Sequence, residues 1–266
     1  MRILVVDAFT DRPFGGNPAG VCLLDGPADP AWMQRVAAEM RHSETAFPRP
    51  IDSPDADFEL RWFTPEVEVA LCGHATLATA HALYDTGTVP PERPIRFQTL
   101  RSGVLTVRRA DGDGLEMDFP AVPATAIDPP ADLAKGLGAT PVWTGRSSQH
   151  DILAVVDDAE TVRKLRPDFE VLASIDARGI CVTATEAPPY DFVSRFFAPT
   201  VGIPEDPVTG SAHCMLGPYW AARLGREDMT AYQASDRGGV VGVVVHGDRV
   251  TLTGRAVTVL DGTLRA

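Results

Sequence analysis

The sequence predicts a strand-rich α+β fold. Apolar runs of four to eight residues, bounded by glycine, proline, aspartate and asparagine, dominate the chain, and helical patterns are fewer. Glycine and proline number 23 each in 266 residues, above average usage, which indicates short elements joined by tight turns. Strands and helices do not alternate regularly, so the pattern is not that of a βαβ protein with a parallel sheet.

These runs give the expected elements in chain order. Strands are expected in the first half at 2–9, 18–24, 44–48, 57–63, 95–99, 103–109 and 114–119. In the second half they are expected at 152–156, 179–185, 190–197, 239–246, 249–253 and 256–260. A helix is expected at 31–41, because Asp29 is a capping residue and Pro30 suits the first helical position. Two longer helices, at 74–84 and 211–224, end near the glycines at 87 and 225.

The two halves of the chain resemble each other on either side of a proline-rich linker at 120–130. Residues 58–65 (FELRWFTP) align with 192–199 (FVSRFFAP) at a constant offset of 134 positions, and Phe, Arg, Phe and Pro match in place. Each segment is followed by a short loop and a glycine-led helix, and the second loop is three residues longer. Chance similarity is the alternative, because only four positions match strictly.

An internal duplication predicts two similar lobes, each with its glycine-led helix in an equivalent place. The N-terminal lobe comprises residues 1–119, to which a final strand at about 255–266 can return. The C-terminal lobe comprises residues 120–254.

Charge and cysteine usage exclude several classes of partner. The net charge of −12 disfavours nucleic acid and anionic membrane surfaces, because both require a basic face. No apolar run approaches the ~20 residues that span a bilayer, and Met1–Phe9 reads as a strand, not as a signal peptide. The four cysteines lie far apart, with no disulfide-scaffold density and no Cys/His cluster typical of zinc. We therefore expect a reduced, cytoplasmic, metal-free protein.

Two glycine-led helix starts have the pattern of an anion site. Gly73 lies between Cys72 and His74, and Gly210 precedes Ser211. Backbone N–H groups in the first turn of a helix lack partners within the helix, so they can hold a carboxylate or an enolate-like oxyanion without a cationic side chain. Two such starts facing each other across a cleft would clamp a small carboxylate substrate.

Four polar residues are candidates for chemistry: three lie at or near these starts, and Glu44 lies in a separate segment, 43–47, after the expected helix at 31–41. Glu44 lies among apolar and small residues, so burial would raise its pKa and let it act as a general acid or base; a structural cap or ion pair is the alternative. His74 can bind or polarise a substrate, relay a proton, or act as a neutral structural donor. Asp206 is a turn or capping residue if it has no role in catalysis, and Ser211 suits a helix cap, since no Gly-x-Ser-x-Gly motif surrounds it.

Cys72 raises a separate, thiol-based mechanism, because a thiol just before a helix N-terminus can have a lowered pKa. A two-thiol racemase needs a second cysteine on the opposite face, and the equivalent place in the second repeat, 206–209, contains none. Cys214 lies one turn inside its helix, where a core role is expected. Two alternatives stay open: a one-thiol racemase or epimerase in which Cys72 and a carboxylate are the two bases, and a binding protein without chemistry.

Four motifs occur together in the order of a known family. They are GNPAGV (16–21), SETAF (43–47), CGHAT (72–76) and DPVTGSA (206–212). With these motifs the chain resembles the phenazine-biosynthesis (PhzF-like) isomerase/epimerase family, over residues 1 to about 220 and at a matching total length. This family is similar in fold to diaminopimelate epimerase and proline racemase. The resemblance implies two lobes, each a strongly curved, mostly antiparallel, barrel-like sheet around a central helix, with the active site in the cleft.

The resemblance also implies an activity and a set of site residues. The best-known member moves a proton between ring carbons of a dihydro-hydroxyanthranilate without metal or organic cofactor, and family members form homodimers. Glu44 matches the catalytic acid/base, and the other catalytic positions are His74, Asp206 and Ser211. Substrate-binding positions within the motifs are Asn17, Cys72, Gly73 and Gly210.

The thiol motif around Cys72 is also similar to that of proline racemases, whereas the best-known phenazine enzyme lacks this thiol. We therefore predict a cofactor-independent isomerase or epimerase that moves a proton on a small carboxylate-bearing substrate.

Overall fold

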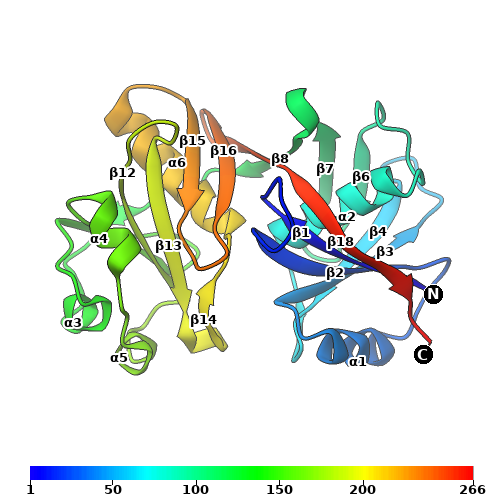
Figure 1. Cartoon of the computed structure of the whole chain (residues 1–266), viewed down its shortest axis with the longest axis horizontal. Coiled ribbons are helices and arrows are strands. Elements are labelled where there is room, and N and C mark those ends of the chain that lie inside the picture. The colour runs from blue at the N-terminus through cyan, green and yellow to red at the C-terminus, as the bar shows by residue number, and fades with distance from the viewer. Residues whose placement is uncertain (266) are drawn as a thin grey trace. The chain divides into compact units, whose positions relative to one another are not determined.

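The computed structural model describes residues 1–265, the side chain of residue 111 excepted, and divides into two compact units. Unit 1 comprises Met1–Asp118 and the C-terminal segment from Thr253, and unit 2 comprises Phe119–Leu252. Each unit combines a curved, mostly antiparallel sheet with few helices (Figure 1). The prediction of an α+β fold is confirmed.

The sheet of unit 1 is built around the apolar first strand of the chain. The pairing order is β18–β1–β2–β3–β4–β6–β7–β8, and β5 is added to the end of β4. Only β2–β3 and β4–β6 pair in parallel among these described strands. The strands are β1 (Arg2–Ala8), β2 (Asn17–Leu23), β3 (Glu44–Pro50), β4 (Phe58–Phe63), β5 (Glu68–Val69), β6 (Ile95–Gln98), β7 (Val104–Arg109), β8 (Leu115–Pro120) and β18 (Ala256–Thr263).

Two helices of different character pack on this sheet. In α2 (Gly73–Asp85), ten of thirteen residues are buried, as expected for a helix that is apolar on all sides, and it packs against β1, β2, β3 and β18. In α1 (Pro30–Met40), Asp29 accepts a hydrogen bond from the Ala31 N–H at 3.0 Å, so the predicted cap and first-turn proline are confirmed. This helix covers β3 and β4 with one face only.

Unit 2 repeats the same succession of pairings. The order is β9–β10–β11–β12–β13–β15–β16, with β14 added to β13, and the parallel pairs are again the third and fifth steps, β11–β12 and β13–β15. The strands are β9 (Thr125–Ala126), β10 (Trp143–Arg146), β11 (Asp151–Val155), β12 (Gly179–Thr185), β13 (Phe192–Ala198), β14 (Ile203–Asp206), β15 (Asp228–Gln233), β16 (Gly239–His246) and β17 (Arg249–Gly254).

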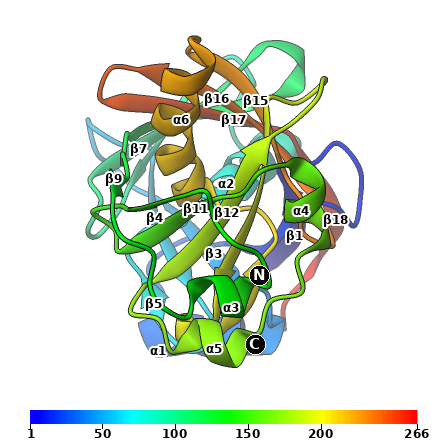
Figure 2. The ribbon, with the colours of Figure 1, turned by 90° about the vertical axis from the view of Figure 1, so that its left-hand side faces the viewer.

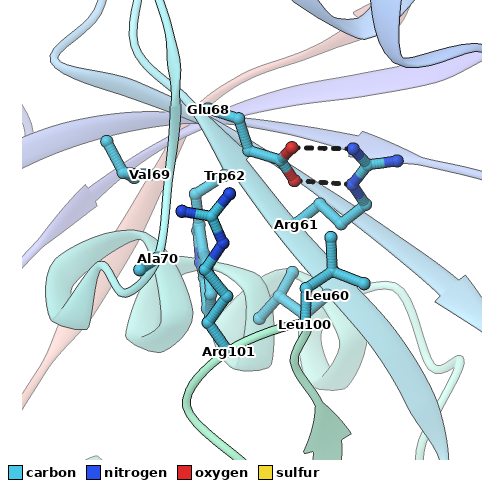
Figure 3. Close-up of a pocket in the computed structure, with 8 residues that line it drawn as sticks. All are labelled: Leu60, Arg61, Trp62, Glu68, Val69, Ala70, Leu100 and Arg101. Carbon is cyan, nitrogen blue, oxygen red and sulfur yellow. Dashed lines mark hydrogen bonds and ion pairs between the residues drawn. The ribbon is translucent and has the colours of Figure 1, made fainter.

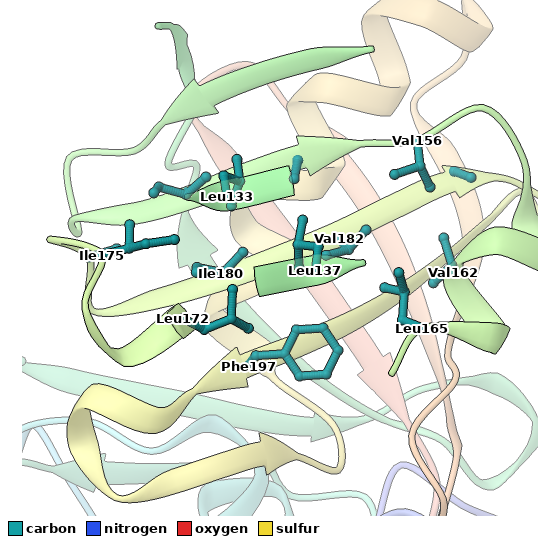
Figure 4. Packing of buried hydrophobic residues seen from close by; sticks show 14 of the residues in the cluster. Leu133, Leu137, Val156, Val162, Leu165, Leu172, Ile175, Ile180, Val182 and Phe197 are labelled. Carbon is teal, nitrogen blue, oxygen red and sulfur yellow. The ribbon is translucent and has the colours of Figure 1, made fainter. Parts of the chain in front are cut away.

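The helices of unit 2 lie on both faces of its sheet. Three short helices, α3 (Leu133–Leu137), α4 (Ala159–Lys164) and α5 (Phe169–Ala173), lie on one face, where leucine, isoleucine and valine side chains form a core with Phe197 (Figures 2 and 4). The long helix α6 (Gly210–Leu224) packs against β15 and β16. Two 3-10 turns, at Asp111–Asp113 and Pro199–Val201, complete the described elements.

Matching ion pairs in the two units support the internal duplication. Arg61 on β4 donates from Nε and Nη2 to the two carboxylate oxygens of Glu68, at 2.7 and 2.8 Å. Arg195 on β13 donates to Glu205 through the same atoms at the same distances. The two glutamates are 137 positions apart. This separation is the offset of 134 positions between the matching strands plus the three additional residues of the second loop. The repeat therefore includes a residue pair that the sequence comparison did not align.

Several elements were missed, and β15 shows why. Its inward-facing residues are Met229, Ala231 and Gln233, so a small and a polar side chain occupy core positions and hide the alternation that marks a strand. The short elements β5, β9, β10, β14 and α3–α5 were also absent from the expected set. Among the described residues, no helix is both long and apolar enough to cross a membrane.

Candidate active site

Five of the predicted site residues lie together in unit 1: Asn17, Glu44, Cys72, Gly73 and His74. Asn17 and Glu44 are the first residues of β2 and β3, which pair in parallel with Ala19 opposite Glu44. Cys72 is the N-cap of α2, and His74 is the second residue of that helix. Because α2 packs across the starts of both strands, side chains distant in sequence meet at one place.

His74 is in contact with a different partner at each ring nitrogen. Its Nε2 lies 3.3 Å from Oε2 of Glu44, and its Nδ1 lies 3.2 Å from Nδ2 of Asn17. The His74 and Glu44 side chains are 7% and 13% exposed, and Asn17 is fully buried. The His74–Glu44 contact is therefore shielded from water on most sides, while Asn17 has no surface to offer a ligand.

Burial keeps the His74 imidazole neutral. Loss of solvation lowers the pKa of His74 to about 3, and the nearby His42 acts in the same direction. At neutral pH the ring therefore carries one N–H group and one bare nitrogen. A neutral imidazole can donate one hydrogen bond, but it cannot provide a positive charge.

The Cys72 sulfur lies beside the imidazole and not on a lone-pair axis. It is 3.5 Å from Nδ1 and 4.0 Å from Nε2 of His74. A sulfur on the axis of the Nδ1 lone pair would lie farther from Nε2 than from Nδ1 by nearly the full width of the ring. Because the two distances are similar, the sulfur lies against the side or face of the ring. The thiol therefore packs on His74 and is poorly placed to exchange a proton with it.

Three side chains of metal-binding type occur at this place. Donor atoms of Glu44, Cys72 and His74 lie within 4.8 Å of one another. Glu44 approaches His74 at Nε2, whereas the Cys72 sulfur is nearer Nδ1, and one imidazole nitrogen at a time can bind a given ion. The Cys72 sulfur also lies 4.0 Å from Nε2, so the other two side chains are both near this nitrogen.

The two glycine-led helices begin in the same way. Cys72 and Thr209, the N-caps of α2 and α6, are extended, and within the described residues neither makes a side-chain capping hydrogen bond. The first intrahelical acceptors are the carbonyls of these caps, bonded by the N–H groups of Thr76 and His213. The three N–H groups before each of these have no partner within the helix, as an anion site requires.

The remaining predicted site residues, Asp206, Gly210 and Ser211, lie in unit 2, and a buried amide holds the loop before α6. Gln233 accepts the Thr209 N–H through Oε1 at 2.9 Å. Its Nε2 donates to the Asp206 carbonyl at 2.8 Å and to Thr209 Oγ1 at 3.1 Å. The Thr209 hydroxyl donates to Oδ2 of Asp206 at 2.6 Å. Gln233 thus positions the Asp206 loop, a role that no local motif indicates.

Arg178 is a second polar residue that the sequence did not single out. Its Nη2 donates to Ser211 Oγ at 3.1 Å and also pairs with the buried carboxylate of Asp151, whose pKa is raised chiefly by loss of solvation. Strand registers match Glu44 of unit 1 with Gly179 of unit 2, so Arg178 occupies the position just before the counterpart of Glu44. The duplicated units therefore differ in charge at equivalent positions.

A pocket elsewhere in unit 1 is distinct from these residues. It lies beside β4 and β5, where Arg61 faces Glu68 and the Arg101 side chain extends past Trp62 (Figure 3). None of the predicted site residues lines it. We therefore place the candidate site at Glu44 and His74 and not at this pocket.

Comparisons with known proteins agree on one family. A family model described as "Phenazine biosynthesis-like protein" matches residues 6–262. An uncharacterized isomerase of Halalkalibacterium halodurans is 49% identical over 264 residues, covering 98% of this chain and 97% of that protein. A human phenazine biosynthesis-like domain-containing protein is 41% identical over 289 residues, covering 100% and 99%.

Solved structures show the same relationship. The crystal structure of a PhzF family phenazine biosynthesis protein from Enterococcus faecalis has a TM-score of 0.93 and 39% identity, covering 100% of this chain and 99% of that one. A hydroxyproline epimerase from Agrobacterium vitis has a TM-score of 0.64 at 15% identity, covering 98% and 91% of the two chains. That second likeness concerns the fold alone.

Proposed function

The chain belongs to the phenazine biosynthesis-like protein family, and from this premise we propose that it is an isomerase or epimerase. Glu44 removes a proton from an acidic carbon of a small carboxylate-bearing substrate and returns it to the same molecule, without a cofactor. Relatives named as isomerases support the reaction class.

The contact between Glu44 and His74 carries this proposal. The neutral His74 imidazole, with Nε2 at 3.3 Å from Oε2, places no positive charge beside the carboxylate and does not hold it in an ion pair, so Glu44 can act as a base. The low exposure of both side chains strengthens every polar interaction with the reacting proton. Developing negative charge on the substrate is stabilised by the N–H groups at the start of α2, beginning with Gly73.

The roles of the unit 2 residues are proposals that rest on the family motif. Asp206 and Ser211 are proposed as further catalytic residues, and Gly210 as a donor of backbone N–H groups. The Gln233 contacts around Asp206 and the Arg178 contact with Ser211 support a defined geometry at this loop.

Incubation with candidate substrates in heavy water tests the proposal. A panel of small cyclic and amino-acid carboxylates is first screened by thermal shift, because a ligand that binds the native state raises Tm. For the true substrate we expect a positional or stereochemical isomer, with deuterium at the reacting carbon, by mass spectrometry and NMR. A compound that raises Tm yet neither isomerises nor exchanges would contradict the proposal and indicate a binding protein.

The one-thiol alternative in which Glu44 is the second base is opposed by the position of Cys72. Two bases that act on opposite faces of one carbon must each approach it to about 3–3.5 Å, so they stand roughly 6–7 Å apart. The Cys72 sulfur and a Glu44 carboxylate oxygen lie within 4.8 Å of each other, which is closer than two such bases stand. The pair therefore suits transfer on one face of the substrate by a single base.

Cys72→Ser is expected to retain turnover within about fivefold of wild type. If the Cys72 thiol were a catalytic base, the same substitution would lower turnover at least a hundredfold, because acid–base groups contribute ~10²–10⁴-fold in rate. Cys22→Ser is the matched control, since Cys22 is buried in the same unit and burial raises its pKa to about 11. The measurement is the initial rate of isomerisation of the wild-type protein and the two variants. A loss of turnover of at least a hundredfold in Cys72→Ser alone would support the thiol mechanism.

A homodimer and a cytoplasmic location stay predictions of the family resemblance and of the cysteine usage. Light scattering of the purified chain measures the oligomeric state directly.

A further inference from the structure

Asn17 is a buried residue that the proposed proton transfer does not use. It lies at the start of β2, is fully buried, and brings its side-chain amide to 3.2 Å from Nδ1 of His74. A residue without exposed surface cannot touch a substrate. The contact that connects its side chain to the proposed proton transfer is the one with His74.

The partners of His74 favour one distribution of hydrogens, given the proposed role of Glu44 as the base. In the proposed resting state Glu44 is a carboxylate, which only accepts hydrogen bonds, so we assign the ring hydrogen to Nε2, which lies 3.3 Å from Oε2. Because the ring is neutral, Nδ1 is then bare and needs a donor. The Asn17 amide nitrogen lies at Nδ1 and supplies one, whereas the Cys72 sulfur lies away from the Nδ1 lone pair.

We propose that Asn17 is a positioning residue that keeps His74 in its neutral Nε2–H form, so that the ring nitrogen 3.3 Å from the Glu44 carboxylate carries the hydrogen. The inference deepens the proposed function and rests on it for the role of Glu44. An acceptor at position 17 would instead draw a hydrogen to Nδ1. The ring would then either present a bare nitrogen to the carboxylate or become an imidazolium that holds the carboxylate in an ion pair.

The tautomer can be observed without a substrate. In ¹⁵N-labelled full-length protein, long-range ¹H–¹⁵N correlation spectra distinguish the two neutral tautomers and the imidazolium of each histidine. We expect His74 as the Nε2–H tautomer between pH 6 and 8. His213 is an internal reference of opposite type, since its Nδ1 lies 2.8 Å from the Thr209 carbonyl and must carry the hydrogen. An Nδ1–H or charged His74 in the wild-type protein would overturn the assignment.

Asn17→Asp tests the cause, because it keeps the size of the side chain and replaces the donor by an acceptor. We expect His74 to convert to the imidazolium or to the Nδ1–H form, while the signals of His81, which lies on α2 of the same unit, stay unchanged and report that unit 1 is folded. Asn17→Ala is the second variant: His74 stays neutral, and the ¹⁵N shift of Nδ1 moves toward that of a nitrogen without a hydrogen-bond donor. An unchanged Nε2–H signal in Asn17→Asp, or an unchanged Nδ1 shift in Asn17→Ala, contradicts the proposal.

Kinetics separate this inference from the proposed function. With an identified substrate, Asn17→Asp should lower kcat at least ~10-fold, since a wrong histidine tautomer can cost as much as ~10⁴-fold, and leave KM within about threefold. If Glu44 is not the base, Glu44→Gln retains turnover while the tautomer assignment stands. If the tautomer assignment is wrong, the effect of Glu44→Gln is untouched.

Discussion

Glu44→Gln is expected to lower turnover at least a hundredfold while leaving the fold intact. Glutamine keeps the shape of the side chain and an oxygen that accepts from His74, but it cannot take up a proton at neutral pH. General acid–base groups typically contribute ~10²–10⁴-fold in rate, so this substitution removes the central chemical step. The measurement is the initial rate of isomerisation, together with deuterium exchange in heavy water.

Glu59→Gln is the matched control for this variant. Glu59 lies on β4 in the same sheet, is partly buried, and is paired with Arg49, so its substitution also removes a carboxylate from unit 1. We expect Glu59→Gln to keep turnover within about twofold, and both variants to give a wild-type far-UV spectrum. Near-full activity in Glu44→Gln would remove Glu44 from the mechanism.

Arg195→Met is expected to destabilise the protein by about 3–5 kcal/mol, the range seen when one partner of a buried ion pair is removed. The Arg195 side chain is 7% exposed and holds Glu205 through two hydrogen bonds. Its Nη1 also donates to the Leu165 carbonyl at 2.9 Å. Methionine fills much of the volume but leaves a carboxylate and a carbonyl without their donor.

The duplication provides the control, because Arg61→Met removes the equivalent arginine of unit 1. Arg61 and its partner Glu68 are 14% and 28% exposed, so water replaces part of the lost interaction, and we expect only about 1–2 kcal/mol. The double variant Arg195→Met/Glu205→Leu should recover part of the loss, since no buried charge is left alone. Urea unfolding of the four proteins measures these differences, and equal losses at Arg61 and Arg195 would contradict the burial argument.

Local chemistry made the main elements and the candidate residues predictable. The cap at Asp29, the apolar run of β1 and the glycine-led starts of α2 and α6 depend on a few neighbouring residues, and all were placed within one or two positions. Short elements such as β10 and α3–α5 escaped, because four to six residues carry too little periodicity.

The partners of the polar residues were not predictable, because they come from distant parts of the chain. Asn17 and His74 are 57 positions apart, and Arg178 reaches Ser211 across 33. Gln233 lies 24 positions beyond Thr209 and on a strand that was itself missed. One such pair could have been found: the offset of the duplication, extended past the longer loop, aligns Glu68 with Glu205.

The sequence by itself determined an α+β chain with a repeated strand–loop–helix unit, two glycine-led helix starts, and Glu44 and His74 as candidates for chemistry. These features follow from side-chain periodicity and backbone chemistry over short stretches. Only the tertiary structure decided which polar group faces which: Glu44 against Nε2 and Asn17 against Nδ1 of His74, with Cys72 beside the ring. The protonation state of a buried group depends on neighbours that folding brings together. For this reason the contacts on which the proposed mechanism rests could not be predicted from the sequence.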